Sequence, residues 1–233
     1  MTNSNKNLVS QAQTGFTLIE MAVVLVILGL VIGTLFAPLA AQRDIRDITG
    51  TQNSLNLIKE AINGFAILNG RLPCPTNQPD PINVNYGLED CTIKTEGYLP
   101  WKTLGVPETD EWGHHRTLTT EAWLGYWRYR ADNYYDQNPQ FNTNILASTP
   151  AFFDNLLVKD SAGNDLTPTA AGAEKPIAIV YSTGKDLVAN GQNLVVDNIY
   201  ESDVNSASFD DILIWITRPV LVNRMVSAGK LPQ

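Results

Sequence analysis

The chain has 233 residues, which is enough for one sizeable domain with an accessory element and does not require a second core. Its 24 Asp and Glu residues outnumber its 16 Lys and Arg residues, and its formal net charge is −8. Because a surface that follows a phosphate backbone needs clustered cations, this balance argues against nucleic acid as a partner.

The first predicted element is an apolar helix. Residues 21–41 carry no formally charged side chain and are mostly Val, Leu, Ile and Ala. A helix of this length rises about 31 Å, enough to cross the apolar core of a bilayer. Since no other stretch has such a run, we expect one membrane crossing, with everything after about Arg43 on one side.

An apolar run of this kind also occurs in secretory signals, in plain signal anchors and in buried core helices. A secretory signal should end in an A-x-A-like pair, but here Ala37 pairs with Leu39 and Pro38 with Ala40. A soluble core helix is rarely apolar on all sides in a chain of this size. The plain signal anchor stays open.

Glu20 places an acid at the beginning of the apolar run. A charged side chain at the centre of a membrane helix costs about 2.5–3.5 kcal/mol on insertion scales, so such a residue usually has a partner. A nearby cation exists only if the chain is cut after Gly15, because that cut creates an α-amino group on Phe16.

Residues 15–35, GFTLIEMAVVLVILGLVIGTL, resemble the class III signal of type IV prepilins and type II secretion pseudopilins. The resemblance implies that a membrane prepilin peptidase removes residues 1–15 by cutting between Gly15 and Phe16, and that Phe16 is N-methylated. It also implies that Glu20 neutralises the amine of a neighbouring subunit during assembly. The assembly helix would then span residues 16–41.

An amphipathic continuation of this helix is predicted over residues 42–70. Apolar side chains recur at helical spacing, and Gly70 is a natural stop. The recurring residues are Ile45, Ile48, Leu55, Ile58, Ile62 and Phe65.

The remaining residues, 71–233, are predicted to form a globular head. Strand patterns at 123–130, 176–182, 193–200 and 211–216 indicate a small antiparallel sheet, and residues 219–228 indicate a short helix. The expected fold class is therefore α+β. It resembles the ladle of type IV pilins, in which the long N-terminal helix packs on the sheet.

Cys74 and Cys91 lie 17 positions apart in a loop-like stretch. In an exported domain, such a pair predicts a disulfide that stabilises the fold by roughly 3 kcal/mol. Two unrelated buried thiols are the alternative.

Enzyme motifs are sparse. The sequence at 182–185 suggests a phosphate loop, but the glycine required six positions before Lys185 is Ile179. His114 and His115 would point to opposite faces of an extended strand and therefore could not share a metal. We expect a protein that is not an enzyme.

Two segments resemble the head of the major pseudopilin of type II secretion: DEWG at 110–113, and YSTGKD at 181–186 with FDDILIW at 209–215. The resemblance implies a calcium ion held by Asp186, Asp210 and Asp211. The long insertion at 191–208 and the adjacent Lys185 depart from the pattern. The alternative is that these acids face solvent.

These patterns predict a structural subunit of a type IV pilus or a type II secretion pseudopilus, and the size of the head favours a minor pilin or pseudopilin. A major pilin and a surface adhesin subunit stay open. The expected partners are prepilin peptidase, other pilin or pseudopilin subunits and an inner-membrane assembly platform, with the head in the periplasm before assembly. The alternative is a single-pass anchor that displays a binding or enzymatic domain.

Overall fold

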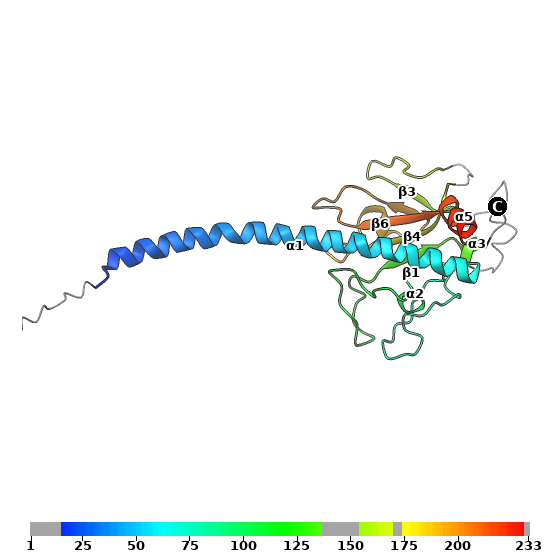
Figure 1. Cartoon of the computed structure of the whole chain (residues 1–233), viewed down its shortest axis with the longest axis horizontal. Helices are drawn as coiled ribbons and strands as arrows, with labels where there is room; N and C mark the ends of the chain where they lie inside the picture. Colours follow the sequence, from blue (N-terminus) through cyan, green and yellow to red (C-terminus); the bar gives the residue numbers. More distant parts are fainter. Residues whose placement is uncertain (1–14, 137–153, 170–173, 231–233) are drawn as a thin grey trace, which may run out of the picture. The chain divides into compact units, whose positions relative to one another are not determined.

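The computed structural model describes residues 15–136, 154–169 and 174–230, and Figure 1 labels its main helices and strands. The chain divides into two compact units, residues 1–45 and 46–233. Helix α1, Leu18–Asn69, contributes residues to both units. Its end agrees with the predicted stop, since Gly70 adopts φ +67° and donates its N–H to the carbonyl of Ala66 at 2.9 Å.

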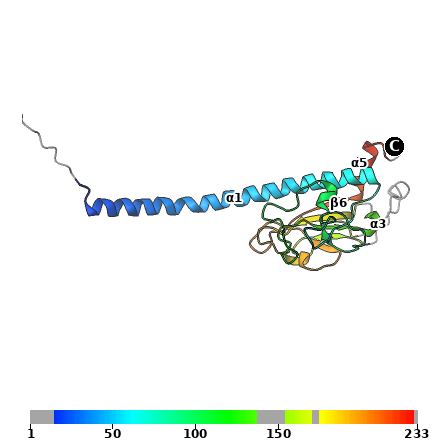
Figure 2. The ribbon, with the colours of Figure 1, turned by 90° about the horizontal axis from the view of Figure 1, so that it is seen from below.

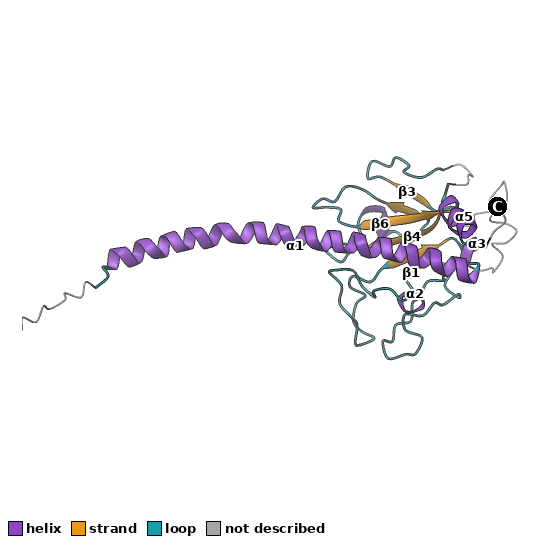
Figure 3. Cartoon of the chain, in the orientation of Figure 1, coloured by secondary structure: helices purple, strands orange, loops and turns teal. Residues whose placement is uncertain are grey.

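The second unit is built on a four-stranded antiparallel sheet, which confirms the predicted α+β fold (Figure 3). Its strands lie in the order β1-β2-β4-β6. Their bounds are Gly97–Tyr98 for β1, Arg128–Ala131 for β2, Pro176–Ser182 for β4 and Ile212–Thr217 for β6. Every residue of β4 is buried, which explains its continuous apolar sequence.

The part of α1 in the second unit seals one face of this sheet (Figure 2). Leu55, Ile58 and Ile62 are fully buried and share one core with Trp127 and Ile177 of the sheet region. Residues spaced three and four apart lie on the same side of a helix, so from Leu55 onward the predicted amphipathic periodicity marks the face that the sheet covers. Ile45, which the same periodicity includes, is 65% exposed.

Smaller elements complete the unit. The helices are α2 (Trp101–Leu104), α3 (Asn133–Asp136) and α5 (Arg218–Ser227), and the last confirms the predicted C-terminal helix. Strands β3 (Leu157–Lys159) and β5 (Ile199–Glu201) form a separate two-stranded sheet in which they run parallel. Neither β1 nor β3 was predicted.

The predicted strand over residues 193–200 is mostly wrong. A 3₁₀ helix, η1 (Gly191–Leu194), occupies its start, and only its last two residues belong to β5. The cause is Asn193, whose Nδ2 donates to the carbonyl of Glu201 and whose Oδ1 accepts from the Glu201 N–H. These bonds hold Asn193 against β5 and leave residues 194–196 exposed. The strand predicted at 123–130 likewise begins only at Arg128.

Packing of α1 on the sheet predicts a large difference between two substitutions on this helix. Ile62 is fully buried, whereas Leu68 is 78% exposed. Ile62→Ala should lower the free energy of unfolding by about 2–5 kcal/mol because it leaves a cavity, and the control Leu68→Ala should change it by less than about 0.5 kcal/mol. Urea unfolding of residues 46–233 measures both, and equal effects would contradict this packing.

Candidate functional site

The start of α1 is closed by a reciprocal hydrogen-bonded cap between Thr17 and Glu20. Both the backbone N–H and the hydroxyl of Thr17 donate to Glu20 Oε2 at 2.8 Å. In return, the Glu20 N–H donates to Thr17 Oγ1 at 3.3 Å. This is a capping box, in which an N-cap Thr and a Glu three positions later satisfy backbone N–H groups that no helical carbonyl can reach.

The capping box gives Glu20 a partner within its own chain, which the sequence reasoning missed. The readable signal was the Thr-x-x-Glu spacing before an apolar run. Both hydrogen bonds from Thr17 go to Oε2. No group among the described residues donates to Oε1. One carboxylate oxygen is therefore available to an external donor while the cap stays closed.

The segment around this cap is exposed throughout. Every residue from Gly15 to Gly33 is exposed, so the bond between Gly15 and Phe16 is open to an external protein. The residues bordering one hollow of about 590 Å³ on this segment are Phe16, Ile19, Glu20, Met21, Val23 and Val24. So much exposed apolar surface is typical of a segment that binds another apolar surface. Of the predicted leader, residues 1–15, all but Gly15 lie outside the described residues.

Within the part of the chain that the structure describes, no helix is both long and apolar enough to cross a membrane. The predicted crossing by residues 16–41 is therefore not confirmed.

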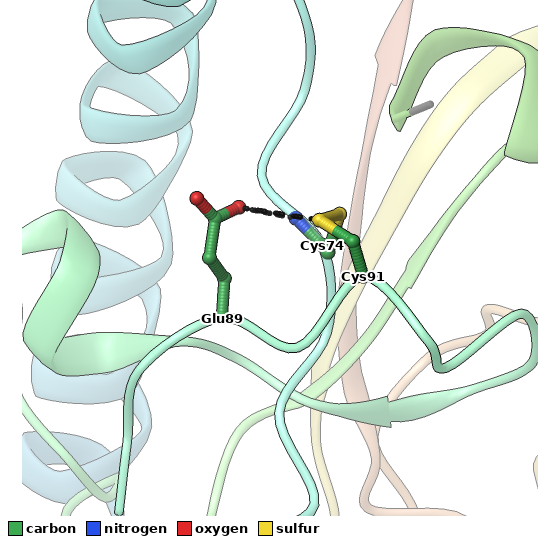
Figure 4. Close-up of side chains that lie close together, drawn as sticks. All are labelled: Cys74, Glu89 and Cys91. Atoms are coloured by element: carbon green, nitrogen blue, oxygen red, sulfur yellow. Dashed lines mark hydrogen bonds between the residues drawn. A yellow bond between two sulfur atoms is a disulfide. The ribbon is translucent and has the colours of Figure 1, made fainter. Parts of the chain in front are cut away.

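The predicted disulfide between Cys74 and Cys91 is present, with the two Cα atoms 5.0 Å apart. Glu89 lies beside it and accepts from the Cys74 N–H at 3.0 Å (Figure 4). Arg71 donates to both Glu89 oxygens, at 2.8 and 2.7 Å. Burial alone would raise the pKa of Glu89, but the hydrogen bonds from Arg71 and Cys74 outweigh it and hold that pKa below its usual value.

Cys74, Glu89 and Cys91 are also the one group of three or more His, Cys, Asp or Glu in the described residues whose ligand atoms lie close enough to share an ion. Both sulfurs are already bonded to each other, and Arg71 occupies the carboxylate. The disulfide and the adjacent ion pair therefore form a structural cross-link that fixes the chain where it leaves α1, and this arrangement does not suit a metal.

Asp186, Asp210 and Asp211 are brought together around one loop. The Asp186 N–H donates to Asp210 Oδ2 at 3.0 Å. Asp211 Oδ2 accepts from the Asn190 N–H at 2.9 Å and from Asn193 Nδ2 at 2.8 Å. Burial, followed by smaller contributions from the charges of Asp210 and Asp186, raises the pKa of Asp211 to about 7.

The carboxylates of Asp186, Asp210 and Asp211 meet some of the requirements of a site for a hard cation such as calcium. Asp210 Oδ1 and Asp211 Oδ1 are buried and have no hydrogen-bond partner among the described residues, as expected of atoms that await a ligand. Asp186 fits less well, because its two oxygens accept from the Val188 N–H and Asn190 Nδ2. Among the described residues, the three carboxylates do not form a group whose oxygens all lie within 4.8 Å of one another.

A close approach of two backbones holds this loop. Gly184 has φ +66°, and a Cβ there would lie 2.4 Å from the backbone oxygen of Asp210. Only glycine fits both constraints, which explains why a glycine stands two positions before Asp186.

Asp110 and Ser182 connect the two segments that resemble the pseudopilin head. Ser182 Oγ donates to Asp110 Oδ2 at 2.5 Å, and Asp110 Oδ1 accepts from the Trp112 N–H at 3.0 Å. Ser182 is fully buried, so it is not placed to attack a substrate. His114 and His115 are exposed. The arrangement ties a loop to the end of β4.

The comparisons with known proteins give one match. Residues 10–36 match the family described as the prokaryotic N-terminal methylation motif. No curated protein and no solved structure matches the chain. The chain thus carries the class III signal of type IV pilins and pseudopilins. This match covers Gly15, Phe16, Thr17 and Glu20, the residues around the exposed cap.

Buried Asp110 predicts a pH dependence of stability. Burial raises its pKa to about 6, whereas the unfolded chain keeps the usual value of 3.8. Between these values the folded state holds a proton that the unfolded state has lost, so the free energy of unfolding falls as pH rises from 4 towards 7. The contribution of Asp110 is at most about 3 kcal/mol.

Asp110→Asn cannot ionise and should reduce the slope of this dependence by the contribution of Asp110, leaving the part that the raised pKa values of Asp136 and Asp211 contribute. The exposed control Asp165→Asn should keep the full slope. Urea unfolding of residues 46–233 at a series of pH values, with chelator present, measures the slope. A slope that is unchanged in Asp110→Asn would contradict the role assigned to this carboxyl.

Proposed function

We propose that the chain is a structural, non-enzymatic subunit of a type IV pilus or a type II secretion pseudopilus, and specifically a minor pilin or pseudopilin. The observation that carries the proposal is the methylation motif at residues 10–36, which coincides with an exposed, capped helix start. A pilin-type signal indicates a protein that prepilin peptidase processes and that is anchored in a membrane before assembly. The specific system and the minor role are parts of the proposal.

In the proposed pathway, prepilin peptidase hydrolyses the bond between Gly15 and Phe16, and the new amine of Phe16 is methylated. The exposure of both residues supports access by the peptidase. The new cation lies one residue before the Thr17 N–H, which already donates to Glu20. Oε1 of Glu20 can accept from the amine of a neighbouring subunit, and this pairing would set the register of adjacent helices.

The proposed location is the bacterial inner membrane, with one crossing by residues 16–41 and the head in the periplasm, followed by assembly into the filament. The intact Cys74–Cys91 disulfide supports an oxidising compartment for the head. The proposed partners are prepilin peptidase, other pilin or pseudopilin subunits and the inner-membrane assembly platform.

Processing is tested by intact-mass and N-terminal analysis of the protein extracted from its own host. The expected chain begins at methylated Phe16. A chain that begins at Met1, or one cut near Ala41, would overturn the proposal and favour a single-pass anchor that displays a binding or enzymatic domain.

Assembly is tested with two substitutions in the capping box. Glu20→Ala removes the carboxylate and the cap, whereas the control Thr17→Val removes the hydroxyl of the cap and keeps the charge. If the pairing with a neighbouring amine matters, both variants are still cleaved after Gly15, but only Glu20→Ala loses incorporation into filaments. A pair worth at least 1.4 kcal/mol corresponds to a loss of roughly tenfold or more. Immunoblots of sheared filaments measure incorporation, and equal losses would assign the role to the cap.

We further propose that Asp210 and Asp211, with Asp186 nearby, bind calcium. The two buried carboxylate oxygens without partners support this. When bound, the ion would neutralise carboxylates whose burial is costly and would bind the loop at 186–190 to the start of β6.

Thermal unfolding of residues 46–233 tests this site. Calcium at a hundredfold excess over its dissociation constant should raise the melting temperature relative to chelator by roughly 5 °C or more. Asp211→Asn should abolish this rise, and Asp165→Asn, at an exposed carboxylate, should keep it. Identical midpoints with calcium and with chelator would exclude the site.

A further inference from the structure

Lys175 is a buried lysine that none of the sites above uses. It directly precedes β4 and is only 4% exposed. Its Nζ donates to Oδ1 of Asn155 at 3.0 Å, and Asn155 lies two positions before β3. The contact therefore joins the start of a strand in the four-stranded sheet to the start of a strand in the two-stranded sheet, labelled β4 and β3 in Figure 1.

The ammonium group of Lys175 has no carboxylate partner. Among the described residues Lys175 forms no ion pair, and its side chain donates there to Asn155 alone. The segments outside the described residues contain no Asp or Glu. A buried ammonium that is held by one neutral amide is costly, because it loses hydration and no opposite charge replaces that hydration. The structure thus favours a change that removes this charge.

The amine and the amide are also placed for a reaction between them. The Cγ atom of Asn155 lies about 1.23 Å from Oδ1, so it is at most about 4.2 Å from Lys175 Nζ. A lysine amine is a nucleophile once it has lost a proton, and reacting atoms about 3–3.5 Å apart are in near-attack range. A small movement of either side chain would bring the amine against the amide carbon.

The backbone that carries Asn155 is fixed. Asn155 adopts φ +54°, a left-handed conformation that Asn tolerates better than most residues. The preceding residue, Asp154, donates its N–H to Asp132 Oδ2 at 3.0 Å, and its Oδ1 lies 3.0 Å from a guanidinium nitrogen of Arg130. The amide of Asn155 is therefore presented to Lys175 with little conformational freedom left to lose.

Carboxyl groups that can supply a proton lie in the same region. Asp132 and Asp136 are both buried. Burial raises the pKa of Asp136 to about 6; the charges of Asp154 and Asp132 add to this rise, and Lys94 opposes it. The nitrogen that leaves an amide must be protonated, and a carboxyl group that titrates near neutral pH suits this task.

We propose that Lys175 and Asn155 form an intramolecular isopeptide bond. Lys175 Nζ bonds to Asn155 Cγ, the bond between Cγ and Nδ2 breaks, and Nδ2 leaves with protons that Nζ gives up. The ammonium and the carboxamide thereby become a secondary amide and an ammonium ion, so no oxidant or other co-reactant is consumed. Asn155 is exposed, so the released ammonium ion can reach water.

Such a bond closes the chain between Asn155 and Lys175 into a covalent loop. A cross-link of this kind stabilises a fold mainly by restricting the unfolded chain. It also keeps β3 and β4 joined where they begin. The inference goes beyond the proposed function and does not depend on it.

Peptide mapping of the full-length chain, extracted from its own host, tests the bond. Trypsin cuts after Lys159, so the bond should join the peptides 131–159 and 160–185 into one species. This species should be lighter than the two peptides together by one ammonia molecule, about 17 Da. Tandem mass spectra should place the bond at Asn155 and Lys175 and distinguish it from a chain left uncut at Lys159. Linked peptides should outnumber unlinked ones, and the reverse would overturn the inference.

Two variants and a matched control test the assignment. Lys175→Arg keeps the positive charge but removes the nucleophilic amine, and Asn155→Gly removes the amide while tolerating the positive φ. Each should reduce the linked species at least tenfold. The control Lys159→Arg alters a lysine whose Nζ lies 3.0 Å from the carboxylate of Asp165, and it should keep the linked species. Persistence of that species in Lys175→Arg, or its loss in the control, would contradict the assignment.

The same samples separate this inference from the proposed function. Covalent multimers on denaturing gels would mean that the bond joins different copies, which would overturn the intramolecular bond. Chains that begin at Phe16 and carry unmodified Lys175 would overturn this inference alone. Chains that begin at Met1 and carry the linked peptides would overturn the proposed function alone.

Discussion

Burial of the α1 face that carries Leu55, Ile58 and Ile62 is the interaction on which the second unit depends. These side chains reach zero exposure against the four-stranded sheet, and β4 could not be buried on all its residues without them. The Cys74–Cys91 disulfide and the neighbouring Arg71–Glu89 ion pair then fix the chain immediately after the helix ends. From Leu18 to Gly33 the same helix is exposed on every side, which is typical of a segment that binds another apolar surface.

Sequence patterns predicted the elements whose burial is periodic or continuous. The spacing of Ile58 and Ile62 identified the buried face of α1, and the uninterrupted apolar run identified β4. The same reasoning failed at residues 193–200, because a pattern of apolar residues does not show that the Asn193 side chain will bond the backbone of Glu201. The short strands β1 and β3 have too few residues to show a period, and the parallel pairing of β3 with β5 depends on contacts distant in sequence.

At the candidate sites, the sequence located the residues but not their bonding. The motif at Gly15, Phe16 and Glu20 could be read directly, whereas the closed cap with Thr17 changes the electrostatic argument. Glu20 already accepts hydrogen bonds from Thr17, so in the proposed assembly an incoming amine would add to an existing set of hydrogen bonds and would not rescue an isolated charge. The Asp210–Asp211 pair was readable as well. That one oxygen of each is buried without a partner depends on three-dimensional packing.

A filament subunit needs contacts that are weak singly and specific together. Helix burial supplies most of the attraction but discriminates poorly, because one apolar helix resembles another. In the proposed assembly, a register fixed by Glu20 would exclude wrong neighbours by leaving its charge without a partner.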